Sequence, residues 1–209
     1  MSFSGKSICV LLTISLFFSC NKKENIEEKY TYEIISLLYN QLTSPIDYSK
    51  SMPPTPNGMA MKKEDSIHLL NYSKELIAKK QIIAIIPELE IPRNRKRKAH
   101  HDCSEYESLL NEYYIIDQKD SLKISKIHNI RKDSIIHFNE SMIDKNRKDF
   151  ENFDILLSFS QIEFNKEYDK AIIATSMSTS RLAGGGSLVF LERKNGLWTV
   201  KCTKNLWIS

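Results

Sequence analysis

The densest group of residues that could do chemistry is a basic run in the middle of the chain. Arg93, Arg95, Lys96, Arg97 and Lys98 place five positive charges within six residues. Such side chains bind phosphate oxygens, so these five form a candidate anion-binding patch, with lipid headgroups as the expected phosphates. A charge run is more often a solvated loop than a binding site. We therefore expect an exposed loop that contributes at most a salt-sensitive surface attraction.

Two histidines and a cysteine follow this run, at His100, His101 and Cys103. These side chains bind zinc, but a zinc site needs four ligands, commonly in two spaced pairs. The other three histidines are isolated in the sequence. We therefore expect neither a metal nor a cofactor.

No catalytic signature is present. The sequence contains no Gly-x-Ser-x-Gly, His-Glu-x-x-His or Cys-x-x-Cys, and the glycines at 184–186 lack the Lys-Ser/Thr of a phosphate-binding loop. We interpret these glycines as a flexible connection between strands. Acidic pairs such as Glu27-Glu28 and Glu88-Glu90 have no geometry that the sequence can assign. The catalytic residues of any enzyme activity stay unknown.

The N-terminus combines a secretory leader with a cysteine at its end. Residues 1–6 carry one positive charge, and residues 7–18 are an apolar run shorter than the ~20 residues that cross a bilayer. Ser19-Cys20 and a polar stretch follow. This pattern resembles the lipobox of bacterial lipoproteins, although Phe17 stands where that family usually has an aliphatic residue.

The resemblance implies a signal peptide at 1–19 and acylation of Cys20, including palmitate-type chains, at the head of a polar tether at 20–29. Each buried CH₂ contributes ~0.8 kcal/mol, so several acyl chains hold a protein firmly at a membrane. Lipoproteins of the Bacteroidetes resemble this looser lipobox, and Lys22-Lys23-Glu24 with Glu27-Glu28 match in part their export signal to the cell surface; a solvated tether is the alternative interpretation of these charges. We expect a cell-envelope protein at the outer membrane, periplasmic or surface-exposed. The alternatives are an ordinary secreted protein or an uncleaved anchor.

The composition fits one folded domain beyond the tether. The chain has 209 residues, of which 41% are hydrophobic and 10% aromatic, enough for a core without disulfides. The net charge of +4 falls by one when Lys6 leaves with the signal, and so mild a charge does not indicate nucleic acid.

Hydrophobic spacing predicts helices in the first half and strands in the second. We expect helices at 25–42, at 65–80 with Ile67, Leu70 and Ile77 facing inward, and at 104–114 behind a Ser104–Glu107 capping box. We expect strands at 81–91, 121–127, 133–139, 154–163 and 170–177. These elements predict a single α+β domain over 30–209, with N-terminal helices packed on a mainly antiparallel sheet.

A C-terminal β-hairpin is predicted at Asn195-Gly196, because Asn-Gly between two alternating runs favours a two-residue turn. The turn fixes a register that pairs Arg193 with Trp198, Leu191 with Val200 and Val189 with Cys202. This register directs Cys202 into the core, and a domain of this size needs no bridge. We therefore expect Cys103 and Cys202 to remain unbridged, although an oxidising envelope permits a disulfide.

The last quarter of the chain resembles a C-terminal module of Bacteroidetes-type lipoproteins of unassigned activity. The matching residues are Phe164-Asn165-Lys166, Ala171-Ile172-Ile173, Gly184-Gly185-Gly186, Lys194-Asn195-Gly196-Leu197-Trp198 and Trp207-Ile208-Ser209. The relatives often carry cysteines in the glycine loop, where this chain has Ser180, Leu182 and Ala183. The resemblance implies a fold and a location but no activity.

We expect a lipid-anchored envelope protein that binds a protein or an envelope glycolipid without catalysis. An envelope hydrolase with an unrecognised site and a membrane-anchored immunity protein are the alternatives. A pocket with converging polar groups would favour the enzyme, whereas a wide apolar or charged surface would favour the binding protein.

Overall fold

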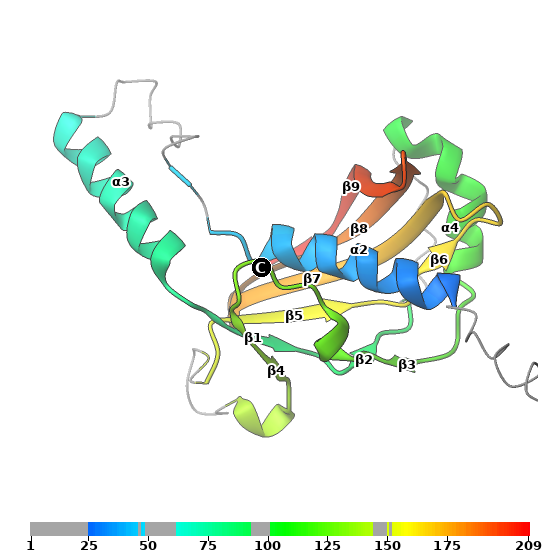
Figure 1. Cartoon of the computed structure of the whole chain (residues 1–209), viewed down its shortest axis with the longest axis horizontal. Coiled ribbons are helices and arrows are strands. Elements are labelled where there is room, and N and C mark those ends of the chain that lie inside the picture. Colours follow the sequence, from blue (N-terminus) through cyan, green and yellow to red (C-terminus); the bar gives the residue numbers. More distant parts are fainter. Residues whose placement is uncertain (1–24, 46, 49–61, 93–100, 144–149, 151) are drawn as a thin grey trace, which may run out of the picture.

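The computed structural model describes residues 25–45, 47–48, 62–92, 101–143, 150 and 152–209, with His101 and Asp102 described by their backbone alone. In this part of the chain, three α-helices accompany a seven-stranded mixed sheet and a separate two-stranded ribbon (Figure 1). The mixed α+β class predicted from the sequence is therefore correct. None of the described helices is both long and apolar enough to cross a membrane.

The helices are α2 (Ile26–Leu42), α3 (Lys63–Ala78) and α4 (Glu107–Tyr113), and a 3₁₀ segment, η2 (His101–Tyr106), leads into α4. Asn25 caps α2, because its side chain accepts a hydrogen bond from the backbone N–H of Glu27 at 3.2 Å. Residues 26–29, which the predicted tether and the predicted helix shared, thus form the first turn of α2. The capping box predicted at Ser104 is absent, because Ser104 lies within η2 and α4 begins without a side-chain cap.

The large sheet has the strand order β4-β1-β5-β7-β8-β9, and β6 pairs with part of β7. Its strands are β1 (Ile82–Ile85), β4 (Ser134–His137), β5 (Ile155–Phe159), β6 (Glu163–Phe164), β7 (Lys170–Ser180), β8 (Ala183–Lys194) and β9 (Leu197–Ile208). β1 runs parallel to both β4 and β5, and the other pairs are antiparallel.

Two strand predictions need correction. The strand expected over 81–91 ends at Ile85, because Pro87 has no N–H to continue the ladder; beyond it, β2 (Glu88–Leu89) pairs with β3 (Asp120–Ser121). The prediction of a strand over 121–127 is wrong. Only its first residue pairs, and a 3₁₀ turn, η3 (Ile124–Lys126), follows. A further 3₁₀ turn, η4 (Glu140–Met142), follows β4.

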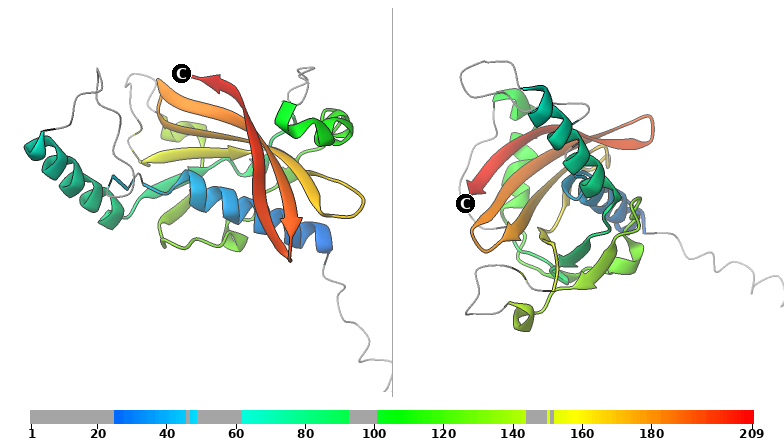
Figure 2. Two further views of the ribbon diagram at one scale, coloured as in Figure 1. Left: turned by 90° about the horizontal axis from the view of Figure 1, so that it is seen from above. Right: turned by 90° about the vertical axis from the view of Figure 1, so that its left-hand side faces the viewer.

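The sheet is covered on both faces, and Figure 2 shows it lying between α2 and α4. On one face, buried residues of α2, among them Ile34, Ile35 and Leu38, share a core with β1, β5, β7 and β8. On the other face, Tyr106 and Leu110 pack with residues that include Phe190 of β8. The hydroxyl of Tyr106 also donates to the backbone carbonyl of Leu191 at 3.0 Å, which fixes η2 over the sheet.

The β8–β9 hairpin has the predicted turn but only part of the predicted register. Leu191 pairs with Val200 as expected, but Phe190, rather than Val189, then pairs with Cys202. The intervening Lys201 is an extra residue, which makes a β-bulge in β9. Because side chains alternate along a strand, this extra residue turns the residues beyond it to the opposite face, up to a second extra residue at Leu206.

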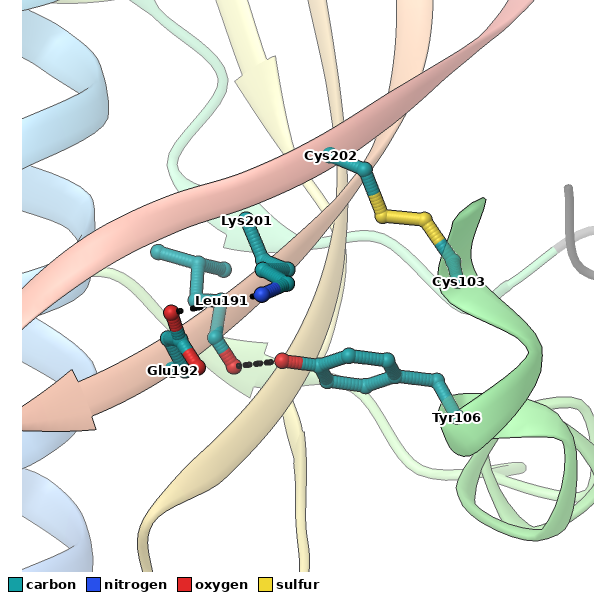
Figure 3. Close-up of a disulfide and its surroundings, with 6 residues drawn as sticks. All are labelled: Cys103, Tyr106, Leu191, Glu192, Lys201 and Cys202. Atoms are coloured by element: carbon teal, nitrogen blue, oxygen red, sulfur yellow. Dashed lines mark hydrogen bonds and ion pairs between the residues drawn. A yellow bond between two sulfur atoms is a disulfide. The ribbon is translucent and has the colours of Figure 1, made fainter. Parts of the chain in front are cut away.

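The bulge directs Cys202 away from the α2 core and toward η2, where it forms a disulfide with Cys103 (Figure 3). Their Cα atoms lie 6.5 Å apart, within the usual range for a disulfide. The expectation that these cysteines remain unbridged is therefore wrong. It failed because the register of the turn does not continue through the bulge.

Helix α3 extends away from the sheet (Figure 1), and two of the residues expected to face inward are exposed. The side chains of Ile67 and Ile77 are 50% and 43% exposed. The helix is held at its C-terminal end, where the guanidinium of Arg131 donates to the carbonyls of Ile77 and Lys79 at 3.2 and 2.7 Å. Arg131 also donates to the buried carboxylate of Asp133 at 3.1 Å, and Lys79 pairs with Asp154 at 2.8 Å, so two ion pairs support this junction.

Candidate ligand-binding site

A cleft of about 520 Å³ lies on the face of the sheet that carries α4, within the usual size range of small-molecule sites. Strands β5, β7 and β8 supply its floor, α4 supplies one side, and the end of β9 supplies another. Residues Glu90, Ile91 and Pro92 line the rim. The cleft therefore combines residues that lie far apart in the sequence.

A chain of hydrogen bonds crosses the floor of the cleft. Ser158 of β5 and Ser176 of β7 are direct cross-strand partners, and their hydroxyl oxygens lie 2.6 Å apart. The Ser158 hydroxyl donates to the carboxylate of Glu90 at 3.1 Å, so its bond with Ser176 uses the Ser176 proton. Because a carboxylate only accepts hydrogen bonds, the chain ends in an acceptor that suits a ligand donor.

A second polar pair belongs to the framework of the cleft. Tyr113 of α4 lies 2.8 Å from the hydroxyl oxygen of Ser160, which itself donates to the carbonyl of Gln161 at 2.7 Å. Tyr113 must therefore be the donor. Burial raises the pKa of the Tyr113 hydroxyl above its ordinary value, so the phenol stays protonated. This pair holds α4 to the end of β5 rather than moving a proton.

Two aromatic side chains, Tyr114 and Trp207, form an apolar part of the lining. Trp207 lies directly over Gly186 of β8, its pairing partner, and a Cβ atom at Gly186 would overlap the indole. The prediction of a flexible glycine connection is wrong, because 184–186 lie inside β8. At Gly186, the absent side chain instead makes room for a cleft residue.

The charges at the rim differ in how they are paired. Lys119 donates to Glu88 at 2.8 Å, which raises the pKa of the lysine and keeps it cationic. Among the residues that the structure describes, no lysine or arginine forms an ion pair with Glu90. Within the described residues, the cleft therefore presents a carboxylate that lies near Lys119 without forming an ion pair, beside hydroxyls and aromatic rings.

A wider hollow of about 780 Å³ lies on the other side of the molecule, between α2 and the hairpin turn. The side chain of Asn40 in this hollow already makes three hydrogen bonds. Its amide nitrogen donates to the carbonyls of Ser36 and His128, both at 2.7 Å, and its amide oxygen accepts from the backbone N–H of Ile130. This side chain holds the loop at 128–130 against α2. The hollow is therefore a weaker candidate than the cleft.

The residues that the sequence singled out do not form this site. Cys20 and the candidate anion-binding patch at 93–98 lie outside the described residues. Of the residues weighed for a metal, His100 and the side chain of His101 lie outside the described part of the chain, and Cys103 is bonded to Cys202. No group of three His, Cys, Asp or Glu side chains in the described part could hold a metal ion.

Sequence reasoning named Glu90 as part of an acidic pair but gave it no partners, and it missed both serines. The available signal was Ser158, a hydroxyl residue within an otherwise apolar strand; Ser176 lies in a strand rich in serine and threonine and gives no such signal. Comparisons of the chain with known protein families, with curated proteins and with solved structures find no match.

Proposed function

We propose that this chain is a lipid-anchored cell-envelope protein, attached through Cys20, that binds a small ligand or ligand headgroup in the cleft beside α4. The observation that carries the binding role is the hydrogen-bonded chain Ser176–Ser158–Glu90, which ends in a carboxylate on the cleft wall. In this proposal the N-terminal helical part of the chain covers one face of the sheet, and η2 with α4 covers part of the other face and leaves the cleft beside it for binding. The anchor places the cleft at the outer membrane.

The lining indicates the chemistry of the ligand. Glu90 already accepts from Ser158 and can accept a further donor such as a hydroxyl or ammonium group, while Tyr114 and Trp207 offer flat apolar surfaces. The saccharide part of an envelope glycolipid combines hydroxyl donors with apolar ring faces. It is therefore the ligand class that we favour, and it agrees with the envelope location.

A hydrolase is the second candidate, and the hydrogen bond between Ser158 and Glu90 is the observation in its favour. A serine nucleophile is usually activated by an adjacent base such as histidine. The described lining residues include no histidine, and the lysine among them, Lys119, is paired with Glu88. Binding without catalysis therefore fits the cleft better.

Thermal unfolding in the presence of glycolipid-derived oligosaccharides tests the binding role. A ligand at 100 times its Kd stabilises the folded state by ~2.7 kcal/mol, which is a measurable rise in Tm. We expect this rise in wild type and in Glu140→Gln, an exposed glutamate of η4, but not in Glu90→Gln. Equal rises in all three proteins, or none in any, would refute the proposed site. Saccharide cleavage that Ser158→Ala abolishes would favour the hydrolase.

The anchor is tested separately, by comparing wild type with Cys20→Ala in cell fractionation. We expect wild type in the membrane fraction with lipid mass on its N-terminal peptide. The variant should stay uncleaved or leave the membrane. Identical fractionation of both proteins, with no lipid on that peptide, would rule out the anchor.

A further inference from the structure

We infer that one end of the domain lies against the lipid bilayer, with Leu197 at the hairpin turn entering the interface. This end is built from the start of α2, the turn between β6 and β7, and the turn between β8 and β9; we call it the anchor end. The inference rests on the proposed acylation of Cys20, and it adds an orientation that the anchor alone does not give.

The three segments of the anchor end are held together by direct contacts. The ring of Tyr30 in α2 lies 5.7 Å from that of Trp198 in β9 and 6.2 Å from that of Tyr168. Arg193 of β8 stacks over Tyr30 at 4.3 Å, and its backbone N–H donates to the carbonyl of Asp169 at 2.7 Å. The anchor end is therefore a fixed surface rather than three independent turns.

The short length of the tether brings this surface to the membrane. Cys20 precedes Asn25, the cap of α2, by five residues, and a fully extended chain of that length spans at most ~18 Å. The start of α2 therefore cannot lie farther than this from the acylated residue. Since α2 begins at the anchor end, this end of the domain must remain close to the headgroups.

The surface chemistry of the anchor end suits an interface. Leu197 is 71% exposed at the hairpin turn, and Ile26 is 46% exposed in the first turn of α2. Residues 26–29, 165–169 and 193–194 together carry four cationic and four anionic side chains, so their charges balance. We therefore expect apolar insertion that does not depend on anionic lipid.

The opposite end of the sheet supplies a matched control. Leu182, in the turn between β7 and β8, is also 71% exposed. It precedes β8, whereas Leu197 follows it, and Figure 2 shows that β8 connects the two ends of the sheet. The twelve residues of β8 separate these leucines by roughly 40 Å at ~3.4 Å per residue.

The test uses the full lipidated protein in phosphatidylcholine vesicles that contain a spin-labelled, quenching lipid. Leu197→Cys and Leu182→Cys each carry one polarity-sensitive fluorophore. Reaction at the new thiol is specific, because Cys20 is acylated in this proposal and Cys103 is bonded to Cys202. We expect a blue shift and loss of emission at position 197, and neither change at position 182.

Vesicle flotation separates the two claims. A protein that floats with the vesicles but shows equal quenching at both positions, or stronger quenching at position 182, overturns the orientation and leaves the anchor intact. A protein that does not float shows that the anchor itself is absent, which overturns both claims.

Discussion

At the residue scale, Gly186 determines the position of Trp207 and therefore the shape of the cleft. We predict that Gly186→Ala displaces the indole, because a Cβ at this position would overlap it. Overpacking of this kind costs about 1–3 kcal/mol. The tryptophan emission spectrum should shift, and stabilisation by the cleft ligand should be lost.

The neighbouring Gly185 is a matched control for this substitution. A Cβ at Gly185 would lie 3.5 Å from the carbonyl oxygen of Trp207, an ordinary contact distance. Gly185→Ala should therefore keep the wild-type emission and ligand response. If Gly186→Ala keeps them as well, the close approach does not shape the cleft.

A second residue-scale prediction concerns the pH dependence of stability. Burial, together with the nearby carboxylates of Glu112 and Glu27, raises the pKa of Glu163 above 4.5. A raised folded-state pKa contributes stability that is complete below pH ~4.5 and is lost as pH rises through the folded value. The side chain in Glu163→Gln does not ionise, so this variant avoids the stability that wild type loses when Glu163 ionises. It should therefore have a higher Tm than wild type at pH 7 but not at pH 4. Glu140→Gln, at an exposed position, should change Tm little at either pH.

At the element scale, the disulfide holds η2, and through it α4, against β9. Bridging residues 99 apart stabilises a fold by up to ~4.7 kcal/mol in the chain-entropy model. For a chain of this size, removing a stabilisation of that magnitude lowers Tm by roughly 10–20 °C. We predict this loss for the double variant Cys103→Ala, Cys202→Ala, measured by thermal unfolding. A reductant should lower the Tm of wild type but leave that of the variant unchanged.

Arg131 is one of the residues that hold the junction between α3 and the sheet, alongside the ion pair of Lys79 with Asp154. Arg131 donates to two carbonyls at the end of α3 and pairs with Asp133, whose side chain is fully buried. Arg131→Gln should cost about 3–5 kcal/mol, because it leaves a buried carboxylate without its cation. The double variant Arg131→Gln, Asp133→Asn should lose less. A loss equal to the sum of the two single losses in a denaturant titration would show that the residues are not coupled.

At the scale of the whole molecule, the sequence predicted those helices and turns that neighbouring residues alone determine. The periodicity of α2 and the Asn195-Gly196 turn need only neighbouring residues, and both elements form as expected. The parallel pairing of β1, the bulge at Lys201 and the second covered face depend on tertiary contacts, so no local pattern revealed them. The cleft was missed for the same reason, because Glu90 and Ser158 are 68 residues apart.

The bridge between Cys103 and Cys202 also has a consequence for the order of events during synthesis. Chains grow from their N-terminus at about 5–20 residues per second, so Cys103 leaves the ribosome roughly 5–20 s before its partner. Cys202 lies in β9, the last strand, so a chain that stops before this strand keeps an unpaired thiol at position 103. A thiol reagent would therefore label position 103 in chains that lack β9 and in longer chains that are still reduced, and loss of this labelling would mark a chain that contains β9 and has been oxidised.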